Sequence, residues 1–383
     1  MSSEKPLAGI TVVEIGHSVA APYAGLILAE LGAEVIKVEN PKSGDYARGW
    51  GPPFWNGTAS AYHGLNRGKQ GVTVDLGDAE EAGRLRRLIL ERADAVIQNL
   101  RAGVMERYGL DAAALRAEKP ELIYCDIGAF GEGGPLSSKP GYDPLMQAFG
   151  GLMSVTGEGG GRPPIRVGVS IMDMGTGMWA AMGILAALLD RAKTGQGGAI
   201  GTSLYETALG WMALPLAGYQ ANGEIRQPHG SGTAEIAPYQ CFPTDGGWLM
   251  IAAGNDKLFQ KLCATLGRPE LGKDGRFLTN GDRVVNRGVL IPMLEEMTRG
   301  WAIAELQAAL DAAGIPNAPL QNIAQVTEHP QTAAVGIIQQ GPEGALPTVG
   351  LPLLFDGKRA GYRAPAPELG EHNDAVFGTA AAK

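Results

Sequence analysis

Short apolar runs and longer amphipathic runs alternate along the first third of the chain. Apolar, β-branched segments at 10–15, 35–38, 72–74, 95–97 and 122–125 have the length and composition of strands. Apolar residues at helical spacing follow several of them, over 22–31, over 78–92 and from 99 to about 109. Such an alternation predicts a mainly parallel sheet with helices on both faces, so we expect an α/β fold.

The stretch 165–190 combines both patterns. Residues 167–171 alternate as in a strand, whereas residues 175–191 repeat at helical spacing. Asp173 stands at the predicted junction. A short carboxylate before a helix is typical of an N-cap, but an ionisable carboxylate beside glycines, with no Lys or Arg close to it, is also typical of a catalytic nucleophile. The local sequence leaves both interpretations open.

The pattern changes again after a strand predicted at 199–203 and a helix predicted at 204–220. A hairpin at 239–251 and a helical region from 256 to about 313 predict a second, smaller α+β domain over residues 225–320. Residues 1–224 then form the larger, N-terminal part of the protein.

Composition narrows the class of protein. Of 383 residues, 45% are hydrophobic and 19% are charged, which is enough apolar material for more than one domain. The net charge of −8, with Lys and Arg dispersed, argues against nucleic acid or an anionic membrane as a partner. Three widely separated cysteines favour reduced thiols in the cytosol. With no apolar signal-peptide core and no apolar run that we expect to span a membrane, a soluble, cytoplasmic protein is predicted.

The candidate chemistry lies in the strand-to-helix turns, because parallel sheets bind ligands outside the carboxyl ends of their strands. These turns contain Val19, Asn99 and Asp173, and the first lacks the glycine fingerprint of a dinucleotide site. The five histidines adjoin no Gly-x-Ser-x-Gly motif, and no His or Cys pair has metal-ligand spacing, which disfavours a serine hydrolase and a metal site. An anionic, nucleotide-bearing ligand and carboxylate chemistry fit what remains.

A set of short motifs runs nearly end to end: VVEI at 12–15, LGAEVIKVE at 31–39, LNRGK at 65–69, GYD at 141–143, GVSIMDMGTG at 168–177, TGQG at 194–197 and GIP at 314–316. In combination they resemble the class III CoA-transferases, the family of formyl-CoA transferase and α-methylacyl-CoA racemase. YDPLM at 142–146, APYQ at 237–240 and AAGN at 252–255 resemble its succinate–hydroxymethylglutarate CoA-transferase branch.

The resemblance implies a fold and an assembly. It implies a Rossmann-like large domain, built from residues 1–224 and a return segment at 321–383, around a small α+β domain at 225–320. It also implies an interlocked homodimer, in which two subunits are threaded through each other like linked rings.

The resemblance implies a catalytic role for Asp173. The positions that it assigns to the CoA site are Val19, Ala20, Asn40, Val74, Asn99, Leu100, Arg101, Arg107, Lys139 and Tyr142. Asn40 stands where formyl-CoA transferase has an arginine, and Lys139 and Arg67 are alternative cations. Residues 229–233 are the expected substitute for the glycine-rich loop that shields the family's aspartate.

The implied reaction moves CoA from an acyl-CoA, such as succinyl-CoA, to a small carboxylic acid, with a dicarboxylate expected. It passes through an aspartyl anhydride and an aspartyl-CoA thioester, with no tightly bound cofactor and no metal. Gly175 and Gly177 are expected to leave space for the thioester, and the helix start to keep Asp173 ionised. Two alternatives remain: a racemase, whose histidine is replaced here by Tyr142, and a non-catalytic acyl-CoA-binding protein.

Overall fold

The computed structural model describes residues 5–378, which form two compact units. Among the described residues, the first unit contains 5–150, 168–212 and 330–378, and the second contains 151–167 and 213–329. Both ends of the chain therefore contribute to one unit. The domain boundaries expected near residues 224 and 320 remain predictions.

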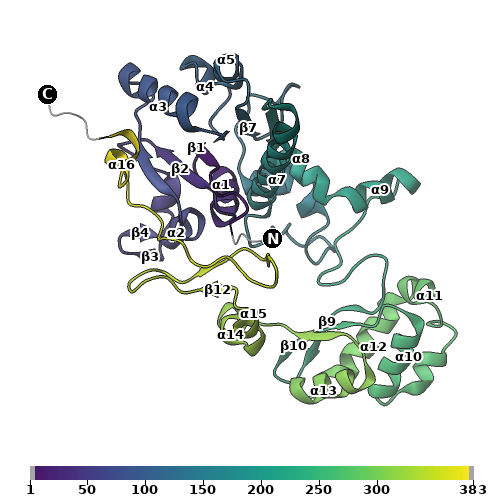
Figure 1. Ribbon diagram of the computed structural model, residues 1–383. Helices are drawn as coiled ribbons and strands as arrows, with labels where there is room; N and C mark the ends of the chain where they lie inside the picture. Colours follow the sequence, from purple (N-terminus) through teal and green to yellow (C-terminus); the bar gives the residue numbers. More distant parts are fainter. Residues whose placement is uncertain (1–4, 379–383) are drawn as a thin grey trace. The chain divides into compact units, whose positions relative to one another are not determined.

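A six-stranded parallel sheet forms the centre of the first unit (Figure 1). Its strands are β1 (Thr11–Ile15), β2 (Glu34–Glu39), β5 (Gln70–Thr73), β6 (Ala95–Gln98), β7 (Ile123–Gly128) and β8 (Ala199–Ser203). Their order, β5-β2-β1-β6-β7-β8, is that of a doubly wound, Rossmann-like sheet. The expected α/β fold is confirmed. The order reverses between β1 and β6, so a ligand crevice is expected at the carboxyl ends of these two strands.

The two faces of the sheet differ because successive side chains of a strand point to opposite sides. Val13 and Ile15 belong to an apolar core cluster that also contains residues of α3 (Ala79–Arg92) and α5 (Ala112–Glu118). Glu14 points to the other side, toward α1 (Ala20–Glu30), where a Cβ on Gly25 would lie 1.9 Å from its carboxylate oxygen. Helix α1 packs against α7 (Ile171–Thr194) on that side.

Shorter elements complete the first unit. They are η1 (Tyr46–Gly49), β3 (Phe54–Trp55), β4 (Thr58–Ala59), α2 (Ser60–Asn66), α4 (Val104–Arg107), α6 (Asp143–Phe149), α8 (Leu204–Trp211), α15 (Pro330–Val335), β12 (Ile338–Gln339), β13 (Thr348–Val349) and α16 (Asn373–Phe377). Helix α16, yellow in Figure 1, lies beside the sheet edge at β5, where the Asn373 side chain accepts from the Thr73 N–H.

The second unit has its own three-stranded antiparallel sheet, in the order β11-β10-β9. Its elements are η2 (Leu152–Ser154), α9 (Ala213–Asn222), β9 (Tyr239–Thr244), β10 (Gly247–Ala252), α10 (Asp256–Thr265), η3 (Pro269–Lys273), α11 (Asn280–Val285), α12 (Arg287–Arg299), α13 (Ile303–Ala313), β11 (Asn317–Pro319) and α14 (Ile323–Glu328). Phe242, Phe259 and Phe277 are buried in the core between this sheet and its helices.

Helix α7 begins earlier than its sequence pattern predicts. The strand expected at 167–171 does not form, and the helix starts at Ile171. The reason is a hydrogen-bond acceptor outside the segment: the Asp143 carboxylate accepts from the backbone N–H groups of Met172 and Asp173, at 2.7 and 3.3 Å. The backbone N–H groups of the first helical turn thereby have an acceptor, and the helix can begin before Gly175.

Two glycines in α7 allow close packing between helices. A Cβ on Gly177 would lie 2.6 Å from the Ala20 carbonyl oxygen in α1, and one on Gly175 would lie 2.9 Å from side-chain atoms of Thr207 and Trp211 in α8. Protein atoms already fill this space. The expectation that these glycines leave room for a substrate was therefore wrong.

Among the described residues, α7 is the one helix whose length and composition would allow it to cross a membrane. The expectation that no segment has these properties was wrong. Such a helix is weak evidence of a membrane span, because the core helix of a soluble protein has the same features. Here α7 packs against α1, β7 and β8.

Gly177→Ala should destabilise the protein by about 1–3 kcal/mol, because the added methyl forces α7 away from α1. The matched control is Gly83→Ala in α3, where the added Cβ approaches only the Arg87 guanidinium, at 3.9 Å. That variant should be more stable than the wild type by about 1 kcal/mol, through helix propensity. Urea denaturation of the three proteins checks the opposite signs, and equal effects of the two substitutions would contradict the packing described here.

Candidate active site

A cavity of about 690 Å³ opens at the carboxyl ends of β1, β6, β7 and β8 in the first unit. Its walls come from the turn after β1, from η1 and Trp50, from the turn between β6 and α4, from the segments that follow β7 and β8, and from Asp173 in α7. The cavity lies where the strand order reverses, as expected for a ligand site in a doubly wound sheet.

The structure brings seven of the predicted site residues together at this cavity: Ala20, Asn99, Leu100, Arg101, Lys139, Tyr142 and Asp173. Four others do not line it. Val19 and Val74 are buried in the core, whereas Asn40 and Arg107 are exposed elsewhere on the unit. The Asn40 side chain accepts from the backbone N–H groups of Lys42 and Ser43 and so closes the turn after β2. The CoA contacts proposed for these four residues remain predictions.

Asp173 is the third residue of α7 and is not its N-cap. The N-cap position is Ser170, which makes no side-chain capping bond. The carboxylate of Asp143 takes that role through its bonds to the first turn, and its other oxygen accepts from the Gln147 side chain at 2.6 Å. The N-cap interpretation of Asp173 was therefore wrong. Within the described part of the chain, the Asp173 carboxyl group has no hydrogen-bond partner, so it is available to a ligand.

The environment of Asp173 opposes its ionisation. Burial, and then the negative charge of Asp143, raise the pKa of Asp173 to about 7. A helix N-terminus favours a carboxylate, but loss of hydration in a partly apolar cavity outweighs that effect here. The helix start was expected to keep Asp173 ionised, whereas burial and the charge of Asp143 raise its pKa to about 7 and so oppose ionisation near neutral pH.

Asn99 holds the protein's own backbone. Its side-chain oxygen accepts from the His17 N–H at 3.0 Å, and its side-chain nitrogen donates to the His17 carbonyl at 3.0 Å. Both polar groups of the carboxamide are therefore engaged with the turn after β1.

The prediction missed His17, which lines the cavity beside Ala20. Its position after the first strand, at the point where the strand order reverses, was the signal that could have identified it.

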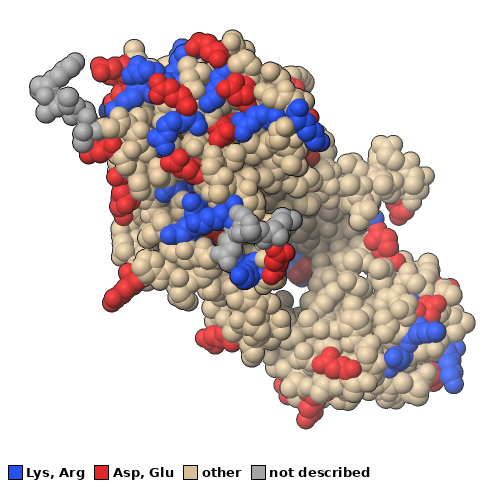
Figure 2. Space-filling model, in the orientation of Figure 1, with Lys and Arg blue, Asp and Glu red and all other residues tan. Residues whose placement is uncertain are grey.

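The charged side chains on the cavity walls are mixed in sign. Glu106, Asp126, Glu132 and Glu206 line it with Asp173, and none of these four acids was predicted. Burial raises the pKa of Asp126, and the nearby charges of Glu132 and Glu106 add to the shift. Arg101 and Lys139 are the exposed cations of the wall. Figure 2 likewise shows acidic and basic side chains interspersed on the face that it presents.

Arg67 is not an alternative cation for a ligand. Its guanidinium is 3% exposed and pairs with Glu30 at 3.0 Å. It also donates to the carbonyl oxygens of Gly64 and Val349. This side chain joins α2 to the C-terminal part of the unit.

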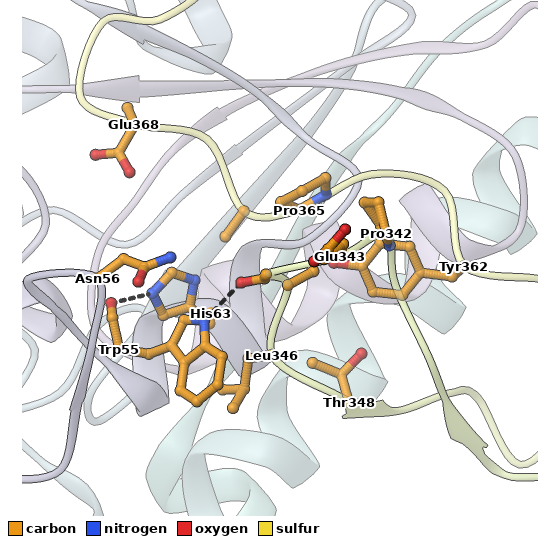
Figure 3. A pocket seen from close by; sticks show the side chains of 13 residues that line it. Trp55, Asn56, His63, Pro342, Glu343, Leu346, Thr348, Tyr362, Pro365 and Glu368 are labelled. Atoms are coloured by element: carbon orange, nitrogen blue, oxygen red, sulfur yellow. Dashed lines mark hydrogen bonds between the residues drawn. The ribbon is translucent and has the colours of Figure 1, made fainter.

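A second cavity of about 250 Å³ lies between the β3–β4 hairpin and residues 342–368 (Figure 3). The Trp55 indole N–H donates to the Gly344 carbonyl at 2.9 Å, and His63 Nε2 lies 3.1 Å from the Trp55 carbonyl. None of the predicted site residues lines this cavity. The first of these bonds attaches the return segment to the hairpin, and the second attaches α2 to it.

Among residues 5–378, no group of three or more His, Cys, Asp or Glu side chains is placed to hold a metal ion. The site is a cavity at the carboxyl ends of parallel strands, and the Asp173 carboxyl group lines it from the first turn of α7, without a hydrogen-bond partner among the described residues. Such a cavity defines a class of protein that takes a small-molecule ligand and can carry out carboxylate chemistry.

Comparison with known proteins identifies the family. Residues 7–373 match the sequence model of CoA-transferase family III. The succinate–glutarate CoA-transferase of Agrobacterium fabrum is 36% identical over 97% of this chain and 95% of its own length. The succinyl-CoA–D-citramalate CoA-transferase of Chloroflexus aurantiacus is 33% identical over 98% of this chain and 95% of its own. The crystal structure of a CAIB/BAIF family protein from Brucella suis superposes with a TM-score of 0.87, at 40% identity, over 98% of this chain and 99% of that one.

The chain belongs to CoA-transferase family III. It is an enzyme that transfers CoA between an acyl-CoA and a carboxylic acid. The resemblance found in the sequence motifs is thereby confirmed.

Asp173→Asn should increase stability above pH 7 and leave it nearly unchanged at low pH. Between about pH 4 and 7 the folded state retains a proton that the unfolded state has lost, so the wild type loses stability as pH rises through this window. Above pH 7 the cost of the buried charge is fully present, and the amide removes it. We expect a gain of up to about 4 kcal/mol at pH 8. Urea denaturation at pH 4 and pH 8 checks this, and an equal effect at both pH values would contradict the raised pKa.

Proposed function

We propose that the protein transfers CoA from succinyl-CoA, or a similar dicarboxylyl-CoA, to a small dicarboxylic acid, with Asp173 as the nucleophile. The single observation that carries the role of Asp173 is its unpaired carboxyl group in the cavity, on the first turn of α7. The dicarboxylate class is supported by the relatives named for succinate, glutarate and D-citramalate, all of which have two carboxyl groups.

The proposed reaction balances without an external reagent. The Asp173 carboxylate attacks the thioester carbonyl, and the carbon–sulfur bond breaks. CoA leaves as a thiolate, and a mixed anhydride of Asp173 and the acyl group forms. The thiolate then attacks the aspartyl carbonyl, which releases the donor acid and leaves an aspartyl-CoA thioester. The acceptor carboxylate attacks the aspartyl carbonyl of this thioester and expels the thiolate, which leaves a new mixed anhydride. The thiolate finally attacks the acceptor carbonyl of that anhydride, which forms the new acyl-CoA and releases the Asp173 carboxylate. One thioester replaces another, so the protein has only to position the groups and exclude water.

Partial burial would make Asp173 a more effective nucleophile toward the thioester. A carboxylate that has lost part of its hydration is a better nucleophile once ionised, and a pKa of about 7 keeps a large ionised fraction at neutral pH.

The CoA site is proposed along the turn between β6 and α4. Arg101 and Lys139 are the exposed cations on the cavity wall that would pair with phosphate groups. Leu100 and Ala20 offer apolar contact. In this arrangement Asn99 acts by holding the neighbouring turn, because its amide is already engaged.

The interlocked homodimer remains part of the proposal. Four large apolar side chains of α7 are exposed in the single chain: Met178 at 44%, Trp179 at 46%, Met182 at 44% and Leu189 at 68%. A contiguous apolar helix face of this kind supports contact with a second protein surface. Coverage by a second copy would also explain why this helix is so apolar.

The experiment that tests the proposed function is an acceptor screen. The protein is incubated with succinyl-CoA and a panel of small acids, and new acyl-CoA thioesters are quantified by mass spectrometry. Transfer to four- and five-carbon dicarboxylates should exceed transfer to monocarboxylates of equal length by at least about tenfold, since the second carboxylate adds a charged contact. Asp173→Ala should lower all transfer to the background rate.

Preferential transfer to monocarboxylates would contradict the proposed acceptor class. Deuterium exchange at the α-carbon of a branched acyl-CoA, without any transfer, would instead support a racemase.

A further inference from the structure

A cluster of buried charges lies beside the cavity, and the proposed reaction does not use it. The Lys37 ammonium lies 3.0 Å from a Glu14 oxygen and 2.8 Å from an Asp45 oxygen, and all three side chains are fully buried. Lys69, also fully buried, pairs with the other Glu14 oxygen at 2.7 Å. Burying charged groups has a large desolvation cost, and apolar residues of similar volume often stabilise a fold equally well. We therefore asked what else the contacts of this cluster achieve.

The cluster holds the backbone of the turn after β1. Lys37 donates to the Gly16 carbonyl at 3.0 Å, and the Asp45 carboxylate accepts from the Ser18 N–H at 2.8 Å. Ser18 has a φ of +71°, a left-handed conformation that is strained for a residue with a side chain. Strain of this kind persists only where the surroundings enforce it, and it concentrates at functional sites.

Asn99 fixes the same turn from the other side, through its two hydrogen bonds to the His17 backbone. Gly16 makes this approach possible, because a Cβ there would lie 2.5 Å from the Ala21 Cβ and 2.9 Å from the Asn99 side-chain oxygen. The backbone of His17 is thus held from β6 on one side and from the buried charges on the other.

The side chain of His17 is held as well. Its Nδ1 lies 2.9 Å from the Ser18 hydroxyl, and its ring meets the Tyr46 ring edge-on, with centroids 4.9 Å apart. In the part of the chain that the structure describes, its second nitrogen, Nε2, has no partner. Burial lowers the pKa of His17, against the opposing effect of Asp45, so the ring is mainly neutral at pH 7. An uncharged imidazole can donate a hydrogen bond without cancelling the negative charge of the Asp173 carboxylate, which lines the same cavity.

We propose that Asp45 and Asn99 are positioning residues that hold the turn 16–18 so that His17 donates a hydrogen bond from Nε2 to an oxygen of the acyl group in the Asp173 cavity. This role requires the tautomer in which the Ser18 hydroxyl donates to Nδ1 and the ring proton is on Nε2. A preorganised donor of this kind stabilises the negative charge that develops on a carbonyl oxygen when a carboxylate attacks it. The proposal rests on the transferase reaction proposed above.

A double-mutant cycle between position 45 and position 17 tests the proposal. His17→Ala should lower kcat/KM by about tenfold or more, through kcat, because the donor acts on the transition state. Asp45→Ala frees the turn and should have a similar effect, since a displacement of about 1 Å is sufficient. The double variant should match His17→Ala alone within about threefold, because a misplaced donor and an absent donor have the same consequence.

Two further variants separate positioning from general stability. Asp45→Asn keeps an oxygen for the Ser18 and Ala47 N–H groups but loses the ion pair, so it should recover most of the activity in spite of a lower Tm. Ser18→Ala removes only the hydroxyl that orients Nδ1, and its effect should also disappear in the His17→Ala background. This variant keeps the test decisive if Asp45→Ala fails to fold.

The matched control is Glu30→Gln. It breaks the buried Glu30–Arg67 pair, whose side chains are 2% and 3% exposed, in the same unit but away from the turn. It should lower Tm and leave kcat within about twofold of the wild type, because nothing at the cavity moves.

The positioning role would be overturned if the effect of Asp45→Ala or of Ser18→Ala added to that of His17→Ala. It would also be overturned if Asp45→Ala or Ser18→Ala kept the wild-type kcat. The transferase assignment would remain intact in both cases. Absence of transfer by the wild-type protein, with every donor and acceptor, would overturn the proposed reaction and this role of His17 with it.

Discussion

The ammonium of Lys37 connects the central strands to the cavity at their carboxyl ends. From β2 it reaches the Glu14 carboxylate on β1, the Asp45 carboxylate before η1 and the Gly16 carbonyl in the turn between β1 and α1. A lysine in a fully buried position is stable only when such partners surround it, so its contacts fix the relative positions of these segments. The wall of the cavity that carries His17 depends on that arrangement, as does the close packing of α1 on the sheet at Gly25.

Two carboxyl groups have different roles at the start of α7. Asp143 accepts three hydrogen bonds and caps the N-terminus of the helix, while Asp173 has no hydrogen-bond partner among the described residues and lines the cavity. Burial and then the charge of Asp143 raise the pKa of Asp173, which destabilises the folded state at neutral pH. A carboxyl group with a raised pKa in a cavity at the carboxyl ends of parallel strands is a candidate for a reacting residue, which is the role that we propose for Asp173.

The local sequence pattern and the motifs were sufficient to predict the parallel sheet, the family and the position of Asp173 at the ligand crevice. They were not sufficient for contacts between distant segments. The alternation at 167–171 is real, but the Asp143 carboxylate starts a helix there instead. Gly175 and Gly177 suggested open space, because a sequence does not show that Trp211 and Ala20 lie opposite. The role of His17 depends on Asn99, Asp45 and Lys37, which come from three separate elements, so no local pattern contains it.

Trapping the covalent intermediate is the most direct test of the central claim, that Asp173 carries the transferred group. The protein is mixed with acyl-CoA without acceptor, treated with hydroxylamine or digested at once, and its peptides are mapped by mass spectrometry. We expect the aspartyl-CoA thioester, or its hydroxamate, on the peptide that contains Asp173, and no adduct in Asp173→Ala. An adduct on another residue, or transfer at the wild-type rate by Asp173→Ala, would contradict the account.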